Sequence, residues 1–440
     1  MLPLTRPRRQ ALITLAMAVL TIAPTSYVAL TAWKIARPGH VRDVEIEMGR
    51  SLGLQVTLDR VRYPRPGEVV YVGIVLRQDE PGRGGLTEVA RAKSLRLRHS
   101  GGGIVLEADG LAIRADGPRG AMAQVGTLLA GVGADGGGAR GVSLAAPTCA
   151  IDLGRGLRFE LRDLAATFRD DPRAPGISAS YRFVDGGGST RCELALTRDR
   201  KAEPVETAVM LKTMEGMPLP ARVLDAFFDS TAWLGRSARA QGAITLKQAG
   251  SGPWSAEFAG DLFDVDLKTL FERRFPRHRM TGLAHLAVRR ARWSDRPGQG
   301  PGWSAAEGEL AAGQGSIGLD LLRALAGEMK FRPARPIDDR HPDVSFTALG
   351  FTFALTPDGE IALGGGFRNQ FGTEDILVLD DRPIFRAPSG SANVRGLLKT
   401  LYPGDNETLA PVTADSQLLS RFLPLPPGVA ARASARLEGN

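Results

Sequence analysis

The chain has 440 residues, a formal net charge of +8, 43% hydrophobic residues and 24% charged residues. This composition is sufficient for buried cores in two or three domains and excludes a chain that is disordered throughout. Basic residues alternate with apolar ones, as in Lys93-Ser94-Leu95-Arg96-Leu97-Arg98, which indicates solvated strand faces and not the clustered basic surface of a nucleic-acid-binding protein. Attraction to anionic lipid headgroups is an alternative use of the charge.

An uncharged stretch covers residues 11–33 and follows Arg6, Arg8 and Arg9. A bilayer core about 30 Å thick needs roughly 20 apolar helical residues, so this stretch is long enough to span a membrane. Its most apolar part is also short enough to be the core of a cleaved secretory signal. We favour an uncleaved anchor, because the following residues offer only imperfect cleavage sites and Trp33 suits a membrane interface.

Both interpretations place the rest of the chain outside the cytoplasm. The arginines before the span favour a cytoplasmic tail of residues 1–10, although Lys34 and Arg37 carry positive charge on the other side as well. We therefore predict a single-pass protein with a cytoplasmic N-terminus. Two regions follow the span, an N-terminal β-rich region at residues 34–215 and a second β-rich region with short helices at residues 216–440.

The first of these regions has the pattern of an antiparallel meander. After a predicted helix at residues 42–50, apolar and polar residues alternate, and clusters of glycine and proline separate the runs. A glycine-rich loop is predicted at residues 131–141. Strands are predicted at residues 54–58, 69–77, 92–99, 104–108, 157–161, 178–184, 192–197 and 205–213.

In the second region short helices interrupt the strands. Asp266 is a good N-cap for one of them, in which Leu267, Leu270 and Phe271 share a face. Helices are predicted at residues 221–234, 267–275, 319–329, 394–402 and 415–422, and strands at residues 243–247, 254–260, 282–291, 303–312, 344–355, 360–363 and 376–379.

The sequence lacks the spacing of a metal site or a nucleophile–base pair. Cys149 and Cys192 leave two alternatives open, a disulfide or two buried thiols. No H-x-x-x-H or H-E-x-x-H motif occurs. The histidines are therefore predicted to be surface residues: His40, His99, His278, His285 and His341.

Two further patterns have simpler structural explanations. The segment Gly313-Gln314-Gly315-Ser316-Ile317-Gly318 matches G-x-G-x-x-G, but its antiparallel surroundings predict a tight turn and no nucleotide site. Asp261, Asp264 and Asp266 lack the spacing of a calcium loop. The pairs Asp338-Asp339 and Asp380-Asp381 are predicted turn residues. We thus predict a protein that is not an enzyme, with no catalytic residues, no bound metal and no cofactor.

Four segments resemble the AsmA-like family of bacterial envelope proteins, part of a class of bridge-like lipid-transfer proteins. GRSLGLQVTLDRVRYPRPGEVVYVGIVL at residues 49–76 looks like the family's opening, where strands follow a membrane helix. QGAITLKQAGSGPWSAEFAGDLFDVDLKTLF at residues 241–271 is similar to its repeated strand, turn, strand and short helix. GEIALGGGF at residues 359–367 and VRGLLKTLYP at residues 394–403 look like its C-terminal region.

The resemblance implies a mainly β fold, with an N-terminal transmembrane helix followed by an elongated, curled antiparallel sheet that forms an apolar groove. It also implies an inner-membrane protein with a periplasmic body that binds phospholipid or another envelope lipid and maintains the outer membrane. This chain is short compared with the large members of the family. The alternative is an envelope scaffold that binds protein partners through its sheet and does not contact lipid.

Overall fold

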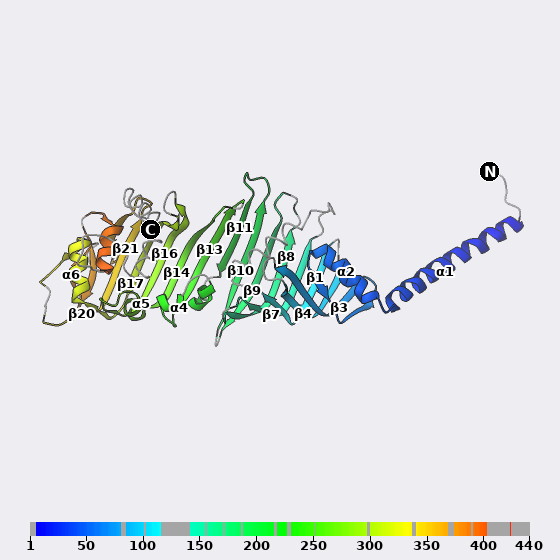
Figure 1. The fold of residues 1–440 in the computed structure, drawn as a ribbon, viewed down its shortest axis with the longest axis horizontal. Helices are drawn as coiled ribbons and strands as arrows, with labels where there is room; N and C mark the ends of the chain where they lie inside the picture. Colours follow the sequence, from blue (N-terminus) through cyan, green and yellow to red (C-terminus); the bar gives the residue numbers. More distant parts are fainter. Residues whose placement is uncertain are drawn as a thin grey trace.

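In the computed structural model, a long curled β-sheet forms the body and helix α1 (Arg6–Ala36) projects from one end of it (Figure 1). This is the mainly β architecture that the sequence predicts. The structure describes the following residues: 6–80, 85–100, 103–115, 141–154, 156–169, 171, 173–185, 188–214, 218–226, 230–250, 252–296, 300–336, 340–367, 374–388, 390–402 and 423.

Helix α1 contains a segment, Ile13–Ala36, that is long and apolar enough to cross a membrane. Its side chains are exposed, with Leu20 at 73% and Val28 at 65%. The hydroxyls of Thr14 and Thr21 donate to carbonyls one turn earlier, at 2.9 and 2.8 Å, so the helix satisfies these polar groups internally. Internal satisfaction of this kind suits a segment surrounded by lipid.

Helix α2 (His40–Leu52) follows after a three-residue link and confirms the predicted helix. Its apolar residues Val41, Val44 and Met48 pack on the first strands of the sheet. Gly53 ends the helix in the left-handed conformation, at φ 65°, which glycine adopts without strain.

The strands pair in chain order over most of the sheet. From β7 to β11, and on through β13, β14, β16 and β17, each strand is antiparallel to the next. The bounds are β1 (Gln55–Thr57), β2 (Arg60–Arg65), β3 (Glu68–Glu80), β4 (Gly85–Ser100), β5 (Gly103–Asp109), β6 (Leu111–Arg114), β7 (Val142–Asp152), β8 (Arg158–Arg169), β9 (Gly176–Asp185), β10 (Gly188–Asp199), β11 (Glu206–Thr213), β12 (Leu219–Pro220), β13 (Arg239–Ala249), β14 (Trp254–Asp266), β16 (Leu283–Arg296) and β17 (Gly300–Ala312).

The pairing of one strand departs from the antiparallel pattern. Strand β7 pairs in parallel with both β5 and β6, so the sheet is mixed at this point. A parallel pairing needs a crossover connection, and the chain between β6 and β7 lies outside the described residues. The predicted loop at residues 131–141 lies almost wholly in that part of the chain.

The sheet continues from β17 into the C-terminal end of the body, where a separate small sheet and short helices cover it. Strand β17 pairs with β21, which pairs with β22 and β23. The bounds are β19 (Arg332–Pro333), β21 (Ala348–Leu355), β22 (Glu360–Gly365), β23 (Asp375–Leu379), β24 (Arg382–Arg386) and β25 (Ala392–Asn393), with β15 (Met280–Thr281), β18 (Gly315–Gly318) and β20 (Asp343–Phe346) in the small sheet.

Three of the predicted C-terminal helices are confirmed: α5 (Leu267–Arg274), α6 (Leu319–Glu328) and α7 (Val394–Leu401). Asp266 caps α5, because its carboxylate accepts the Lys268 amide at 3.0 Å. The predicted helix at residues 221–234 is wrong: the chain forms a 3₁₀ helix, η1 (Ala221–Ala226), and a separate short helix, α4 (Ser230–Leu234). Asp225 explains the break, because its carboxylate accepts the Thr231 amide at 2.9 Å and so caps α4.

Several turn predictions can also be compared with the structure. Asp380 and Asp381 join β23 to β24 with φ values of 49° and 60°, so both are turn residues as predicted. The predicted strand at residues 344–355 is divided into β20 and β21, which belong to different sheets. The pair Asp338-Asp339 and the predicted helix at residues 415–422 lie outside the described residues.

Cys149 and Cys192 are free, fully buried thiols, which resolves the two alternatives against a disulfide. They lie on β7 and β10, and strands β8 and β9 separate them. Three strand spacings of about 4.8 Å exceed the roughly 7 Å between Cα atoms that a disulfide can bridge. Burial raises the pKa of each thiol to about 11, so both stay protonated and unreactive near neutral pH.

We therefore expect the folded protein to resist thiol reagents at pH 8 and to react at two cysteines once it is unfolded. Because the folded pKa values lie above the ordinary value of 9.0, these thiols should also lower the free energy of unfolding as the pH rises from about 9 to 11. Mass spectrometry after alkylation, with and without denaturant, measures the reaction. Rapid alkylation of the folded chain would contradict the burial of these thiols.

Candidate functional site: an apolar cavity in the curled sheet

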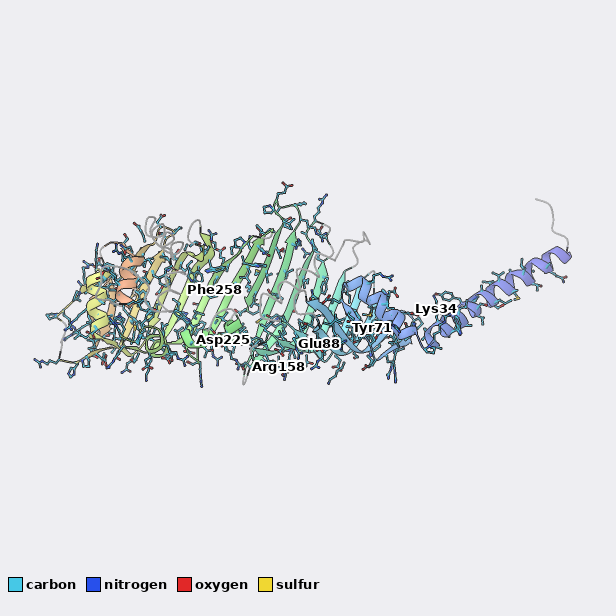
Figure 2. All side chains as sticks on the ribbon, viewed as in Figure 1. Lys34, Tyr71, Glu88, Arg158, Asp225 and Phe258 are labelled. Carbon is cyan, nitrogen blue, oxygen red and sulfur yellow. The ribbon has the colours of Figure 1, made fainter. Side chains whose placement is uncertain are left out.

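The inner face of the C-terminal half of the sheet carries rows of apolar side chains that run across neighbouring strands. In one row Ile244 on β13 pairs with Phe258 on β14, and Phe258 pairs with Ala291 on β16. The row continues through Ala306 on β17 to Leu355 on β21. Because side chains alternate between the faces of a strand, in-register pairing places all of these on one surface. Figure 2 shows Phe258 in this half of the sheet.

A second row lies parallel to the first, and a row of small residues separates the two. The second row runs across the same strands: Ala240, Leu262, Leu286, Leu310 and Phe351. The row between them contains Gly242, Gly260 and Gly308 on β13, β14 and β17, with Val288 on β16. Val288 and Phe353 occupy the other positions of this middle row, so glycine is present at three of its five positions.

The glycines of the middle row are required by close backbone packing. A Cβ atom at Gly260 would lie 2.1 Å from the Gln241 carbonyl oxygen, and one at Gly242 would lie 2.3 Å from that of Ala259. A Cβ at Gly308 would lie 2.8 Å from the Phe353 ring. No side chain fits at these positions without moving the neighbouring strand or ring.

Short helices form the roof over this floor. Apolar side chains come from α5, such as Leu270 and Phe271, from α6, such as Leu322, and from α7, such as Leu397. Helix α6 lies at the end of the body opposite α1 (Figure 1). The roof residues pack with the floor in one large hydrophobic cluster.

Floor and roof border a half-open cavity of about 680 Å³. This volume is within the roughly 300–1,000 Å³ of known small-molecule sites. None of the described residues that line the cavity is charged. The lining residues with hydrogen-bonding side chains are Thr213, Gln241, Trp303 and Thr400. Thr213 is satisfied locally, because its hydroxyl accepts the Gly242 amide at 2.7 Å. The cavity is therefore suited to an apolar ligand.

The apolar inner face extends from the cavity toward the N-terminus. Leu196, Val209 and Leu246 form a small cluster on β10, β11 and β13, and the two cysteines belong to the next cluster. The alternation of apolar and polar residues along each strand predicts this continuous apolar face. The roof could not be predicted in the same way, because it brings together helices that are far apart in the chain.

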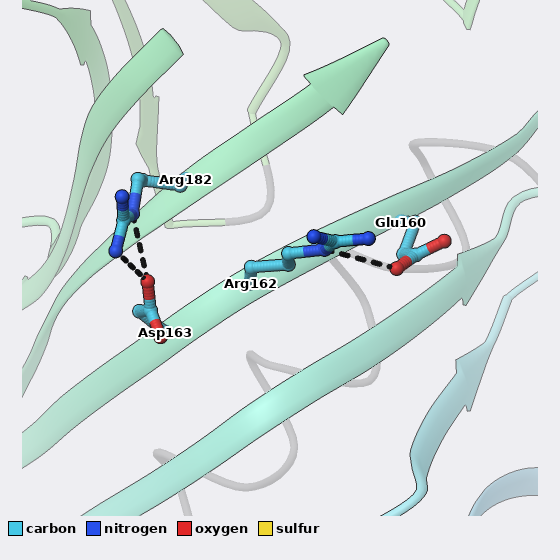
Figure 3. Close-up of polar contacts among 4 residues, drawn as sticks. All are labelled: Glu160, Arg162, Asp163 and Arg182. Atoms are coloured by element: carbon cyan, nitrogen blue, oxygen red, sulfur yellow. Dashed lines mark hydrogen bonds and ion pairs between the residues drawn. The ribbon is translucent and has the colours of Figure 1, made fainter. Parts of the chain in front are cut away.

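The outer face of the sheet is charged, and many of its arginines are paired. Arg290 lies 2.9 Å from Glu257 on the neighbouring strand. Figure 3 shows two further examples, in which Arg182 donates to Asp163 and Arg162 donates to Glu160. Exposed pairs of this kind contribute little to stability, about 0–1 kcal/mol each, but they keep the outer face hydrated.

The prediction that His278 is a surface residue is wrong. Its ring is 3% exposed, and its Nε2 atom donates to the Thr400 carbonyl oxygen on α7 at 2.6 Å. Burial lowers its pKa below the ordinary value. Alternation could not reveal this contact, because it joins positions 122 residues apart. His285 is exposed on the outer face, where it lies 2.8 Å from Asp261 and stacks on Phe263.

The other candidate motifs have structural roles. Residues Gly315–Gly318 form β18, an antiparallel strand before α6, so the glycine motif has no parallel βαβ context. Of the three acidic residues, Asp261 contacts His285, Asp264 occupies a bulge at φ 53°, and Asp266 caps α5. The described residues contain no group of three His, Cys, Asp or Glu side chains placed to hold a metal.

We expect His278 to make the roof sensitive to acid. A histidine whose folded pKa is lowered favours the neutral form, so its contribution is complete above the ordinary pKa of 6.5 and is lost as the pH falls below it. The His278→Gln variant should therefore show a smaller fall in Tm than the unmodified protein when the pH is lowered from about 7.5 to about 5.5. The exposed His341→Gln variant is the control. Equal pH dependence in all three proteins would contradict the role of His278.

No family model matches this chain, and neither a curated protein nor a solved structure is similar enough to count as a match.

Proposed function

We propose that this chain is a membrane-anchored lipid-handling protein of the AsmA-like type, and that its cavity holds an acyl chain of a phospholipid or a similar envelope lipid. The observation that carries the proposal is the apolar cavity of about 680 Å³ between the sheet and the short helices. The described lining offers no charged group for a polar substrate, and van der Waals contact along its rows suits a flexible hydrocarbon chain.

The apolar lining also supports a role without a chemical step. General acid–base catalysis needs a titratable side chain within hydrogen-bond reach of the reacting atom. His278, a buried titratable group that contacts the roof helix α7, is committed to the Thr400 carbonyl. In this proposal the protein binds and releases lipid with no cofactor or metal.

We further propose that α1 spans the inner membrane, with the N-terminus in the cytoplasm and the body in the periplasm. The exposed apolar length of α1 supports an anchor, and the three arginines before it support this orientation. A body next to the membrane would exchange lipid with the outer leaflet of the same bilayer.

The orientation predicts that protease added to spheroplasts digests the chain beyond Lys34, whereas intact cells protect it. Immunoblotting of the fragments against a tag at each end measures the cleavage. Two results would refute the anchored orientation: protection of the body in spheroplasts, or a mature soluble protein that begins after Trp33.

The cavity predicts that the full chain, purified in mild detergent, retains phospholipid that mass spectrometry detects. Ile244→Glu places a carboxylate among apolar side chains and should reduce the recovered lipid by roughly fivefold or more, because a buried charge lacks compensation there. Met210→Glu is the matched control, because Met210 is 37% exposed on the outer face of the neighbouring strand and should leave lipid recovery unchanged.

A second variant guards against a folding defect in the first. Ala306→Phe fills part of the cavity without adding charge, and it should also reduce lipid recovery while the far-ultraviolet circular dichroism stays that of a β protein. Purified protein without lipid, together with no lipid transfer between vesicles, would favour the alternative of a scaffold that binds protein partners.

A further inference from the structure

Four exposed arginines lie on elements that follow α1, two on helix α2 and two on strand β2. We call Arg42, Arg50, Arg62 and Arg65 the α2–β2 arginines; all four are exposed. Arg42 is six residues beyond the last residue of α1, so the chain cannot carry it more than about 20 Å away. Lys34 lies at the junction between α1 and the body (Figure 2).

A contact between His40 and Tyr63 brings the β2 arginines to the same place. His40, at the start of α2, lies 2.7 Å from the Tyr63 hydroxyl, and the two rings are 5.7 Å apart. Tyr63 is the direct neighbour of Arg62 and two residues from Arg65. The turn after β2 is therefore held against the end of α2 that is attached to α1.

The α2–β2 arginines differ from the paired arginines of the sheet. On the outer face, Arg182 has Asp163 as its partner (Figure 3), and Arg290 has Glu257. Within the part of the chain that the structure describes, none of the α2–β2 arginines has an ion pair. Residues 34–65 contain seven Lys and Arg against four Asp and Glu, so this end of the body carries excess positive charge.

Apolar and aromatic side chains accompany this charge. Ile46 is 53% exposed and lies between Arg42 and Arg50 on the face of α2 that points away from the sheet. Tyr63 is 39% exposed. At the end of α1 the Arg37 guanidinium stacks 3.5 Å above the Trp33 ring. Basic residues mixed with exposed aromatic and apolar side chains are typical of a surface that lies in the headgroup layer.

We propose that the α2–β2 arginines dock this end of the body on the anionic phospholipid headgroups of the membrane that α1 spans. The proposal rests on the membrane anchor but not on lipid in the cavity. A body bound at α1, α2 and β2 would be held in one orientation, whereas α1 alone would leave it free to tilt. Each arginine near an anionic surface changes the ratio of docked to free body by roughly fivefold.

A fluorescent probe at Ile46→Cys tests the proposal in the full chain. Both native cysteines are buried, so an environment-sensitive dye should label the introduced thiol selectively. The labelled protein is reconstituted in nanodiscs of phosphatidylcholine, with and without about 30% phosphatidylglycerol. We expect a blue shift, and quenching by headgroup-proximal spin-labelled lipid, only in the anionic nanodiscs, and we expect both to be lost in about 1 M NaCl.

The variant Arg42→Gln/Arg50→Gln/Arg62→Gln/Arg65→Gln should lose the docking signal. The matched control, Arg162→Gln/Arg182→Gln/Arg289→Gln/Arg290→Gln, removes the same charge from the outer face and should keep it. An equal signal in neutral and anionic nanodiscs, an unchanged signal in the first variant, or failure of the full chain to insert would each overturn the docking proposal. Protein that docks but carries no lipid would overturn the proposed cargo alone, and protein that carries lipid but does not dock would overturn docking alone.

Discussion

The register between neighbouring strands is the constraint on which the rest of the structure depends. A shift of one residue would move Ile244 or Phe258 from the inner face to the outer face, and in the case of Phe258 it would bring the neighbouring Glu257 into the cavity. Since Ile244, Phe258, Ala291 and Ala306 stay aligned over four strands, a continuous apolar floor forms. Register shifts between Phe258 and Gly260 and at Asp264 absorb the extra residues that would otherwise disturb this alignment.

Helices cover the inner face of the sheet differently at the two ends of the body. At the N-terminal end helix α2 packs Val44 and Met48 on the first strands. At the C-terminal end the roof helices pack with the floor in one hydrophobic cluster but leave an apolar cavity beside it. The same sheet is therefore covered by α2 at the end next to α1 and borders the cavity at the far end. Our proposals follow this division, with membrane contact at the first end and ligand at the second.

Local patterns in the sequence were sufficient for much of the fold but not for the site. Period-two alternation located most strands, and Asp266 marked the start of α5. Strand β7 was missed because its alanines and Pro147 give it weak strand propensity; its place is fixed by neighbours on both sides. The cavity depends on contacts such as His278 with Thr400, which no local spacing encodes. The sequence therefore predicted the individual helices α5, α6 and α7 but not their arrangement as a roof.

The chain-order pairing of β7 to β17 has a consequence for how the protein is made. Each new strand in this stretch finds its partner in the strand synthesised just before it, so contacts form over short sequence separations, and such topologies fold quickly. A chain that becomes available from its N-terminus onward can add strands one at a time to a growing edge. The parallel join of β7 to β5 and β6 is the exception. A parallel pair needs a crossover connection, so this step joins strands over a longer sequence separation than the antiparallel steps do.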